Sequence, residues 1–265
     1  MRQPSLFLPH GGGPCFFLEP DGGCPPMWRE MRDHLAAILP SLPRQPRAIL
    51  IVSGHWEESG FTVHAGARPD LLFDYHGFPE PTYRLRHDAP GAPELAGEVA
   101  RLLSAAGFPT GIETRRGWDH GVFVPLKVVD PAAELPIVQL SLRHDLDPAA
   151  HIAVGQALAP LRDDDVLIVG SGMSFHNMRA RDGSAAVRSD DFDRALVDAA
   201  TDPDPEERRA RIAAWEELPE ARYAHPREEH LLPLMVALGA GADDPAHHLF
   251  RDHVIGWTVS AFRFG

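Results

Sequence analysis

Residues 48–57 read AILIVSGHWE and combine an apolar run with a glycine and a histidine. A short run of aliphatic and β-branched residues that is bounded by glycine is typical of a buried strand. The same order recurs in residues 5–11 (SLFLPHG), where the run leads to His10. It recurs again in residues 166–177 (VLIVGSGMSFHN), where the run leads to His176. These stretches predict a buried sheet with histidines near the strand ends.

Segments with strand-like and helix-like patterns alternate along the rest of the chain. Strands are expected over residues 136–141 and 254–264, and residues 61–65 are expected to be a hairpin partner of the 48–52 strand. Helices are expected over residues 28–42, 92–106, 149–161 and 233–238, and after Pro205 through Trp215. No linker stands out. We therefore expect residues 1–265 to form a single α/β domain, with a central mixed, mostly parallel sheet flanked by helices.

Composition excludes several classes of protein. The 265 residues carry a formal net charge of −13, which argues against a nucleic-acid partner because phosphates require a basic face. The chain has no apolar stretch of about 18 residues and no start typical of a signal peptide, so a cytoplasmic protein without a membrane partner is expected. In that compartment Cys15 and Cys24 are expected to be free thiols.

Three histidines are the candidate metal ligands. His10 and His55 each follow an apolar run beside glycine. Ligands in open α/β sheets bind outside the carboxyl ends of the strands, so these imidazoles are expected to converge there, and converging imidazoles indicate a metal. His230 is the third candidate, at the start of an apolar helix. Its ring is expected to face inward while Glu228 and Glu229 face solvent.

Two further histidines fit catalytic roles. His176 follows a Gly-Ser-Gly turn and suits a general acid or base, whose pKa must lie near the working pH. His120 lies in residues 117–121 (GWDHG) and is expected to face the pocket, with Asp119 fixing its tautomer. Residues 74–90 are rich in proline and aromatic side chains, and we expect them to form an irregular loop that walls the pocket.

Short motifs in a fixed order add a family resemblance. They are LFLPHG at 6–11, VSGHW at 52–56, GFP at 77–79, WDHG at 118–121, VQLS at 138–141, GSG at 170–172, EHLLPL at 229–234 and FRFG at 262–265. In these motifs the chain resembles the LigB-type (class III) extradiol ring-cleaving dioxygenases, specifically the 4,5-DOPA dioxygenase-like branch. Any one motif is weak, but their shared order along nearly the whole chain is specific.

The resemblance implies an oxidoreductase that opens the aromatic ring of a catechol, DOPA-like or a related diol, with O2. It implies one divalent metal per chain, held by His10, His55 and His230, with Fe(II) in the active enzyme and Zn(II) as an alternative bound species. His176 would be the acid/base and a fourth ligand when the site holds zinc. His120 would line the pocket. Many extradiol enzymes use a carboxylate where this chain has its third histidine.

Residues 74–90 are the expected substrate wall. Phe78 and Tyr83 would pack against the aromatic ring of the substrate, and Arg84 or Arg86 would pair with a substrate carboxylate. Two other functions stay open. One is a zinc-dependent hydrolase on the same scaffold, with His176 or Glu57 as base; the other is a non-enzymatic binding protein similar to the Memo group. The sequence also leaves open the preferred catechol, the ring bond that is cut and whether the chain forms a homo-oligomer.

Overall fold

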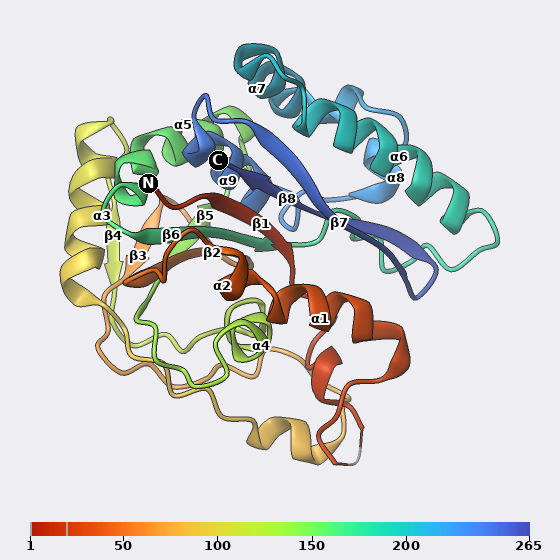
Figure 1. Ribbon diagram of the computed structural model, residues 1–265, viewed down its shortest axis with the longest axis horizontal. Helices are drawn as coiled ribbons and strands as arrows, with labels where there is room; N and C mark the ends of the chain where they lie inside the picture. Colours follow the sequence, from red (N-terminus) through yellow and green to blue (C-terminus); the bar gives the residue numbers. More distant parts are fainter. Residues whose placement is uncertain (1, 20) are drawn as a thin grey trace.

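The computed structural model describes residues 2–19 and 21–265 and is built around one eight-stranded sheet (Figure 1). Its strands are β1 (Ser5–Pro9), β2 (Ala48–Glu58), β3 (Thr62–His64), β4 (Gly111–Glu113), β5 (Ile137–Arg143), β6 (Val166–Gly172), β7 (Ala246–Val254) and β8 (Trp257–Phe264). The strand order is β4-β3-β5-β2-β6-β1-β8-β7. Strands β5, β2, β6 and β1 are mutually parallel, so their carboxyl ends reach the same edge. This confirms the predicted mixed, mostly parallel sheet.

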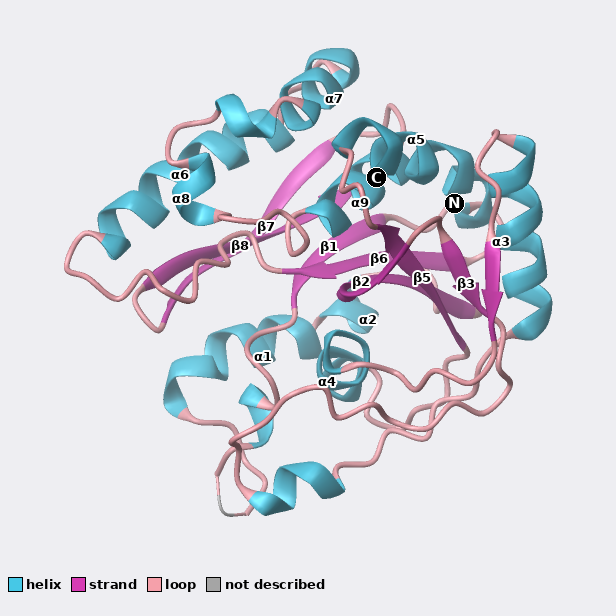
Figure 2. Cartoon of the chain, turned by 180° about the vertical axis from the view of Figure 1, so that it is seen from behind, coloured by secondary structure: helices cyan, strands magenta, loops and turns pink. Residues whose placement is uncertain are grey.

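Helices cover both faces of the sheet (Figure 2). They are α1 (Arg29–Ala36), α2 (Ile38–Ser41), α3 (Pro93–Ala105), α4 (His120–Val129), α5 (Pro148–Leu158), α6 (Ala185–Ala200), α7 (Pro205–Ala213), α8 (Ala221–Ala224) and α9 (Leu232–Gly241). Helix α9 packs against β1, β2, β6 and β8 with α5 behind it, whereas α4 packs on the other face against β2 and β6. Every residue of α9 is buried, as expected for a helix enclosed between a sheet and outer helices.

Three details differ from the sequence-based expectation. The 61–65 segment is not a hairpin partner of β2, because β5 and β6 already occupy both edges of β2; β3 pairs with β5 and β4 instead. Strand β2 continues to Glu58, so His55 lies inside it, beside a register shift in the pairing with β5. The 28–42 helix divides into α1 and α2, because Pro40 has no N–H to donate to the preceding turn.

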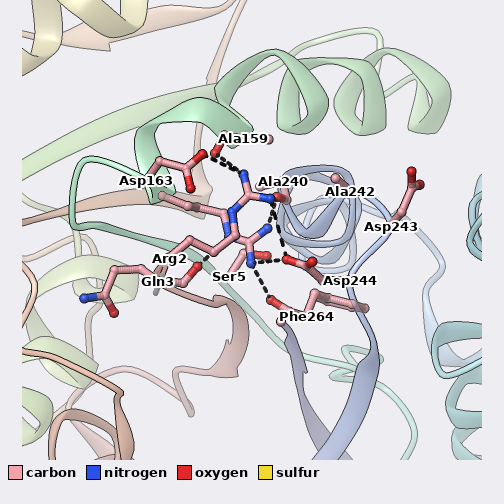
Figure 3. A network of polar contacts seen from close by, with 12 residues as sticks. Arg2, Gln3, Ser5, Ala159, Asp163, Ala240, Ala242, Asp243, Asp244 and Phe264 are labelled. Atoms are coloured by element: carbon pink, nitrogen blue, oxygen red, sulfur yellow. Dashed lines mark hydrogen bonds and ion pairs between the residues drawn. The ribbon is translucent and has the colours of Figure 1, made fainter.

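A buried guanidinium joins the ends of the chain to the helical layer. The side chain of Arg162 is fully buried, and its Nε donates to the carbonyl of Gln3 at 2.7 Å. Its Nη1 donates to the carbonyl of Ala240 at 2.7 Å, and its Nη2 contacts Asp244 at 2.7 Å and the carbonyl of Phe264 at 3.2 Å. Figure 3 shows how Gln3, Ala240, Asp244 and Phe264 gather in this polar network. One side chain therefore joins the segment before β1, the end of α9 and the end of β8.

Two smaller expectations also concern the described residues. Cys15 and Cys24 are both free thiols, as predicted. No helix in residues 2–19 or 21–265 is both long enough and apolar enough to cross a membrane.

Candidate metal centre

Five histidines meet at the carboxyl edge of the parallel strands. His10 directly follows β1, His55 lies within β2 and His176 follows β6. His230 precedes α9, and His120 is the first residue of α4. All five line one cavity of about 400 Å³. The structure therefore brings together every histidine that the sequence singled out.

Two glycines allow the segment that carries His230 to approach the sheet closely. A Cβ atom at Gly54 would lie 3.1 Å from the carbonyl oxygen of Glu229 and 3.3 Å from Cα of His230. A Cβ atom at Gly172 would overlap the carbonyl oxygen of His230. The N–H of Met173 donates to that same oxygen at 3.0 Å and anchors the segment to the end of β6. Because these two glycines have no Cβ, the backbone that carries the candidate metal ligand can lie close to the sheet.

His10, His55 and His230 present their ring nitrogens to one point. Each offers a nitrogen within 4.8 Å of the other two, and Nε2 of His55 lies 3.1 Å from Nε2 of His230. Two nitrogens bound at about 2.0–2.1 Å to one tetrahedral ion are separated by about 3.3 Å. Nε2 of His10 is buried and has no hydrogen-bond partner among the described residues. A divalent cation fits this donor set and would give the buried nitrogen its partner.

The second nitrogen of each ring faces an oxygen atom. Nδ1 of His10 lies 2.8 Å from the carbonyl of Gly11, and Nδ1 of His230 lies 2.8 Å from Oε1 of Glu229. Nδ1 of His55 lies 3.7 Å from a carboxylate oxygen of Asp74. An N–H that points to an outer oxygen fixes the tautomer and leaves Nε2 to bind the metal.

The electrostatics of these rings also suit metal binding. Burial, followed by the nearby imidazoles, lowers the pKa of His10, His55 and His230 well below the usual value. The rings are therefore neutral near pH 7, and neutral imidazole is the form that ligates metals.

Glu229 corrects one expectation, because its carboxylate does not face solvent. Its Oε1 lies 2.8 Å from Nδ1 of His230 and 3.4 Å from Nδ1 of His176. Residues 229–231 form a turn ahead of α9, and within this turn the carboxylate of Glu229 contacts the ring of His230 instead of lying on the opposite side of a helix. Burial alone would raise the pKa of Glu229, but the contact with His176 and the charges nearby lower it.

Asp74 takes the role that the sequence suggested for Asp119. The carboxylate of Asp119 accepts from Oγ of Ser53 at 2.7 Å and from Nε2 of Gln139 at 2.6 Å. Oδ1 of Asp74 instead accepts from the backbone N–H of His120 at 2.9 Å and from its Nδ1 at 2.8 Å. No local pattern links Asp74 to a histidine so far along the chain.

The aromatic loop divides between wall and support. Phe78 lines the cavity, but Tyr83 is not among the residues that do. The hydroxyl of Tyr83 accepts from the N–H of Phe78 at 3.4 Å, and its ring packs against Tyr75 with centroids 5.3 Å apart. Tyr83 therefore lies behind the cavity wall.

The charged residues proposed for this region lie away from the cavity. Arg84 pairs with Glu80 at 2.7 Å and is largely exposed, and Arg86 is also largely exposed. Neither lines the cavity. The carboxylate of Glu57 pairs with Arg227 at 2.6 Å, and this partner lowers the pKa of Glu57. Glu57 does not line the cavity either, so it is not placed to act as the base of a hydrolase there.

Three neutral imidazoles that could hold a metal ion, with two more beside them at the edge of a mostly parallel sheet, form a site typical of α/β metalloenzymes. The family model described as the catalytic LigB subunit of aromatic ring-opening dioxygenase matches residues 4–262. The chain belongs to this family, whose dioxygenases are metal-dependent and act on a small molecule with O2.

Curated relatives cover most of the chain. The dioxygenase tasH of Hapsidospora irregularis is 36% identical over 99% of this chain and 85% of its own length. The 4,5-DOPA dioxygenase extradiol of Beta vulgaris is 38% identical over 82% of this chain and 81% of its own length. The Escherichia coli K12 protein of the same name is 34% identical, with coverages of 90% and 85%. A crystal structure of an uncharacterized Escherichia coli K12 protein is 30% identical, covers 100% of both chains and superposes with a TM-score of 0.78.

Proposed function

We propose that this protein is an extradiol dioxygenase, which opens the ring of a catechol, DOPA-like or a related diol, with O2. Residues 1–265 would form one catalytic domain. The observation that carries the proposal is the meeting of His10, His55 and His230 beside His176 in one cavity. The family and the names of the curated relatives support the same reaction.

One divalent metal would be held by Nε2 of His10, His55 and His230. Fe(II) is the proposed ion of the active enzyme, and Zn(II) is the proposed alternative occupant, with His176 as a fourth ligand in that case. When bound, the metal supplies electron transfer between the diol and O2. The oxygen atoms beside Nδ1 of His10 and His230 would hold these two rings in place for it.

His176 would move the protons of the reaction. Its Nδ1 faces the carboxylate of Glu229, which leaves Nε2 for the substrate in the cavity. There it would take a phenolic proton from the catechol and return a proton when the ring opens. His120 would hold a substrate oxygen through its own Nε2, because its Nδ1 is bound to Asp74. Phe78 would contact the aromatic ring, with Tyr83 supporting it from behind.

The test is oxygen uptake by the Fe(II)-loaded protein with a panel of catechols, followed together with the yellow colour of a ring-opened semialdehyde. We expect one O2 to be consumed per catechol opened, and both signals to be lost in His55→Ala together with the metal. Anaerobic cleavage of esters by the zinc-loaded protein, without oxygen uptake, would replace the proposal with a hydrolase. Absence of stoichiometric metal binding would favour a binding protein.

A further inference from the structure

The cavity lining combines the histidines with large apolar side chains. The apolar lining residues include Leu18, Met173, Phe175, Met178, Ile255 and Trp257. The indole N–H of Trp257 donates to the carbonyl of Ala180 at 2.7 Å, so the ring offers the cavity only apolar surface. Cavities of about 300–1,000 Å³ bury drug-sized ligands. The volume of about 400 Å³ therefore accommodates a substituent on the catechol as well as the ring itself.

The described part of the cavity wall carries no permanent cation for a substrate anion, and its imidazole outside the candidate centre is that of the exposed His76. Among the described residues that line the cavity there is no lysine and no arginine, and the carboxylate of Asp74 is already bonded to His120. Arg179 and Arg181 are close to Met178 in sequence but do not line the cavity. Moving a carboxylate from water into such a cavity costs free energy when no protein group replaces the hydrogen bonds that it made with water. The net charge of −13 adds general repulsion of anions.

Two large apolar side chains lie exposed at the rim of this cavity. Met178 is 49% exposed and Ile255 is 45% exposed, although both belong to the cavity wall. Exposed apolar side chains that also line a cavity are suited to contact an apolar group of a ligand.

Ile255 is also held in a strained backbone conformation. It has φ of 46° and Gly256 has φ of 89°, between the paired residues Val254 and Trp257. A two-residue hairpin turn with both φ values positive favours Asn-Gly or Asp-Gly. A β-branched residue is an outlier at positive φ, and such strain clusters at functional sites. The turn thus keeps an apolar side chain at the rim where a polar residue would fit the backbone better.

Resting on the proposed function, we propose that the cavity selects catechols whose substituent is uncharged and apolar. Met178 and Ile255 are the specificity-determining residues and contact that substituent at the rim. Catechols that carry a carboxylate are disfavoured, because no lysine or arginine among the described residues lines the cavity.

A matched pair of substrates tests this selectivity. A catechol with a butyl chain and dihydrocaffeate have side chains of similar length, but the second ends in a carboxylate. We expect the metal-loaded protein to favour the butyl compound by about tenfold or more, in anaerobic affinity and in kcat/KM. Equal or better binding of dihydrocaffeate overturns the proposal.

Variants at the rim locate the effect. Met178→Lys places a cation at the rim, so we expect it to reduce or invert the preference for the butyl compound. Ile255→Asn suits the turn and should weaken binding of the butyl compound alone. The control is Met27→Lys, which adds the same charge at a residue that is 55% exposed and not on the cavity wall, and it should keep the wild-type ratio. A wild-type ratio in Met178→Lys overturns the assignment.

The two proposals fail separately. Anaerobic binding that favours the butyl compound, with no oxygen uptake by either catechol, supports the selectivity and contradicts the dioxygenase function. Oxygen uptake with both catechols at equal kcat/KM and equal affinity supports the function and contradicts the selectivity.

Discussion

The imidazole ring of His176 stacks on that of His230, with ring centroids 3.4 Å apart and ring planes inclined by 17°. Nδ1 of both rings faces the same oxygen of Glu229, at 3.4 Å and 2.8 Å respectively. One carboxylate thus orients a proposed metal ligand and a proposed proton carrier together. Its contacts tie metal binding and proton transfer to a single side chain.

Replacement of Glu229 by glutamine should weaken metal binding. The amide keeps an oxygen near the two rings but loses the charge that favours an N–H at Nδ1. Loss of such an outer partner typically costs about 10–100-fold in metal affinity or activity. Competition with a chelator measures the affinity. The control is Glu228→Gln, because Glu228 pairs with Arg222 at 2.6 Å and should leave the affinity unchanged; equal affinities in both variants would contradict the assignment.

His176→Ala should separate proton transfer from metal binding. We expect kcat to fall by about 10²–10⁴-fold, the usual contribution of a positioned acid/base, while metal content stays near that of the wild type. His230→Ala should instead lose the metal, because it removes one of three ligands. Elemental analysis of both variants, together with their turnover rates, shows whether each residue acts on metal binding or on proton transfer. Equal metal loss in the two would make His176 a ligand.

The sequence predicts those parts of the site that depend on local pattern. Strands β1, β2 and β6 are continuous apolar runs, and parallel strands must deliver their carboxyl ends to one edge, so His10 and His55 could be placed together. The pairing of Asp74 with His120 could not be predicted from the sequence, because it depends on how a long irregular loop folds back. The inward position of Glu229 depends likewise on a turn that resembles a helix start in sequence.

Helices and strands with polar outer faces are also hard to predict from the pattern of apolar residues. Helix α6 lies in a segment dominated by charged residues, and its buried side is revealed only by residues such as Phe192 and Leu196, spaced four apart. Strand β7 is the outermost strand and its side chains are mostly exposed, so it has no apolar run. The sequence pattern places residues 254–256 in the last strand, whereas Val254 ends β7 and Ile255 and Gly256 form the turn before β8, so the apolar rim around Ile255 could not be predicted.

Stability should fall in mild acid because of His151. Burial lowers the pKa of His151 to about 4, whereas in the unfolded chain it lies near the ordinary value of about 6.5. Between these values the unfolded chain binds a proton that the folded chain does not, so stability decreases as pH falls from about 6.5 towards 4 and is unaffected above that range. Through this one group, the free energy of unfolding falls by up to about 1.4 kcal/mol for each pH unit in that range.

His151→Gln removes this titration and should reduce the loss of stability on acidification. Nδ1 of His151 bonds the carbonyl of Asp147 at 2.7 Å, and its Nε2 accepts from the N–H of Arg143 at 3.2 Å. A glutamine amide offers one donor and one acceptor for the same partners. Denaturant unfolding at about pH 5 and about pH 7 gives the change in the free energy of unfolding between these pH values, for the wild type and for the variant. Parallel losses in wild type and variant would show that His151 is not the source.

Arg162→Met should destabilise the whole fold. The buried guanidinium contacts the carbonyls of Gln3, Ala240 and Phe264 and the carboxylate of Asp244, and methionine leaves these acceptors without their donor. Removal of one partner from a buried charged network costs about 3–5 kcal/mol.

Urea unfolding at constant metal load measures the loss of stability in Arg162→Met. The control is Arg2→Met, which removes a part-exposed ion pair to Asp163 at 3.1 Å and should cost less than about 1 kcal/mol. Arg162→Lys should recover little, because an ammonium lacks the planar fork that reaches several acceptors at once. A free energy of unfolding for Arg162→Met within about 1 kcal/mol of wild type would mean that the packing of α9 on the sheet, and not this guanidinium, joins the chain ends to the core.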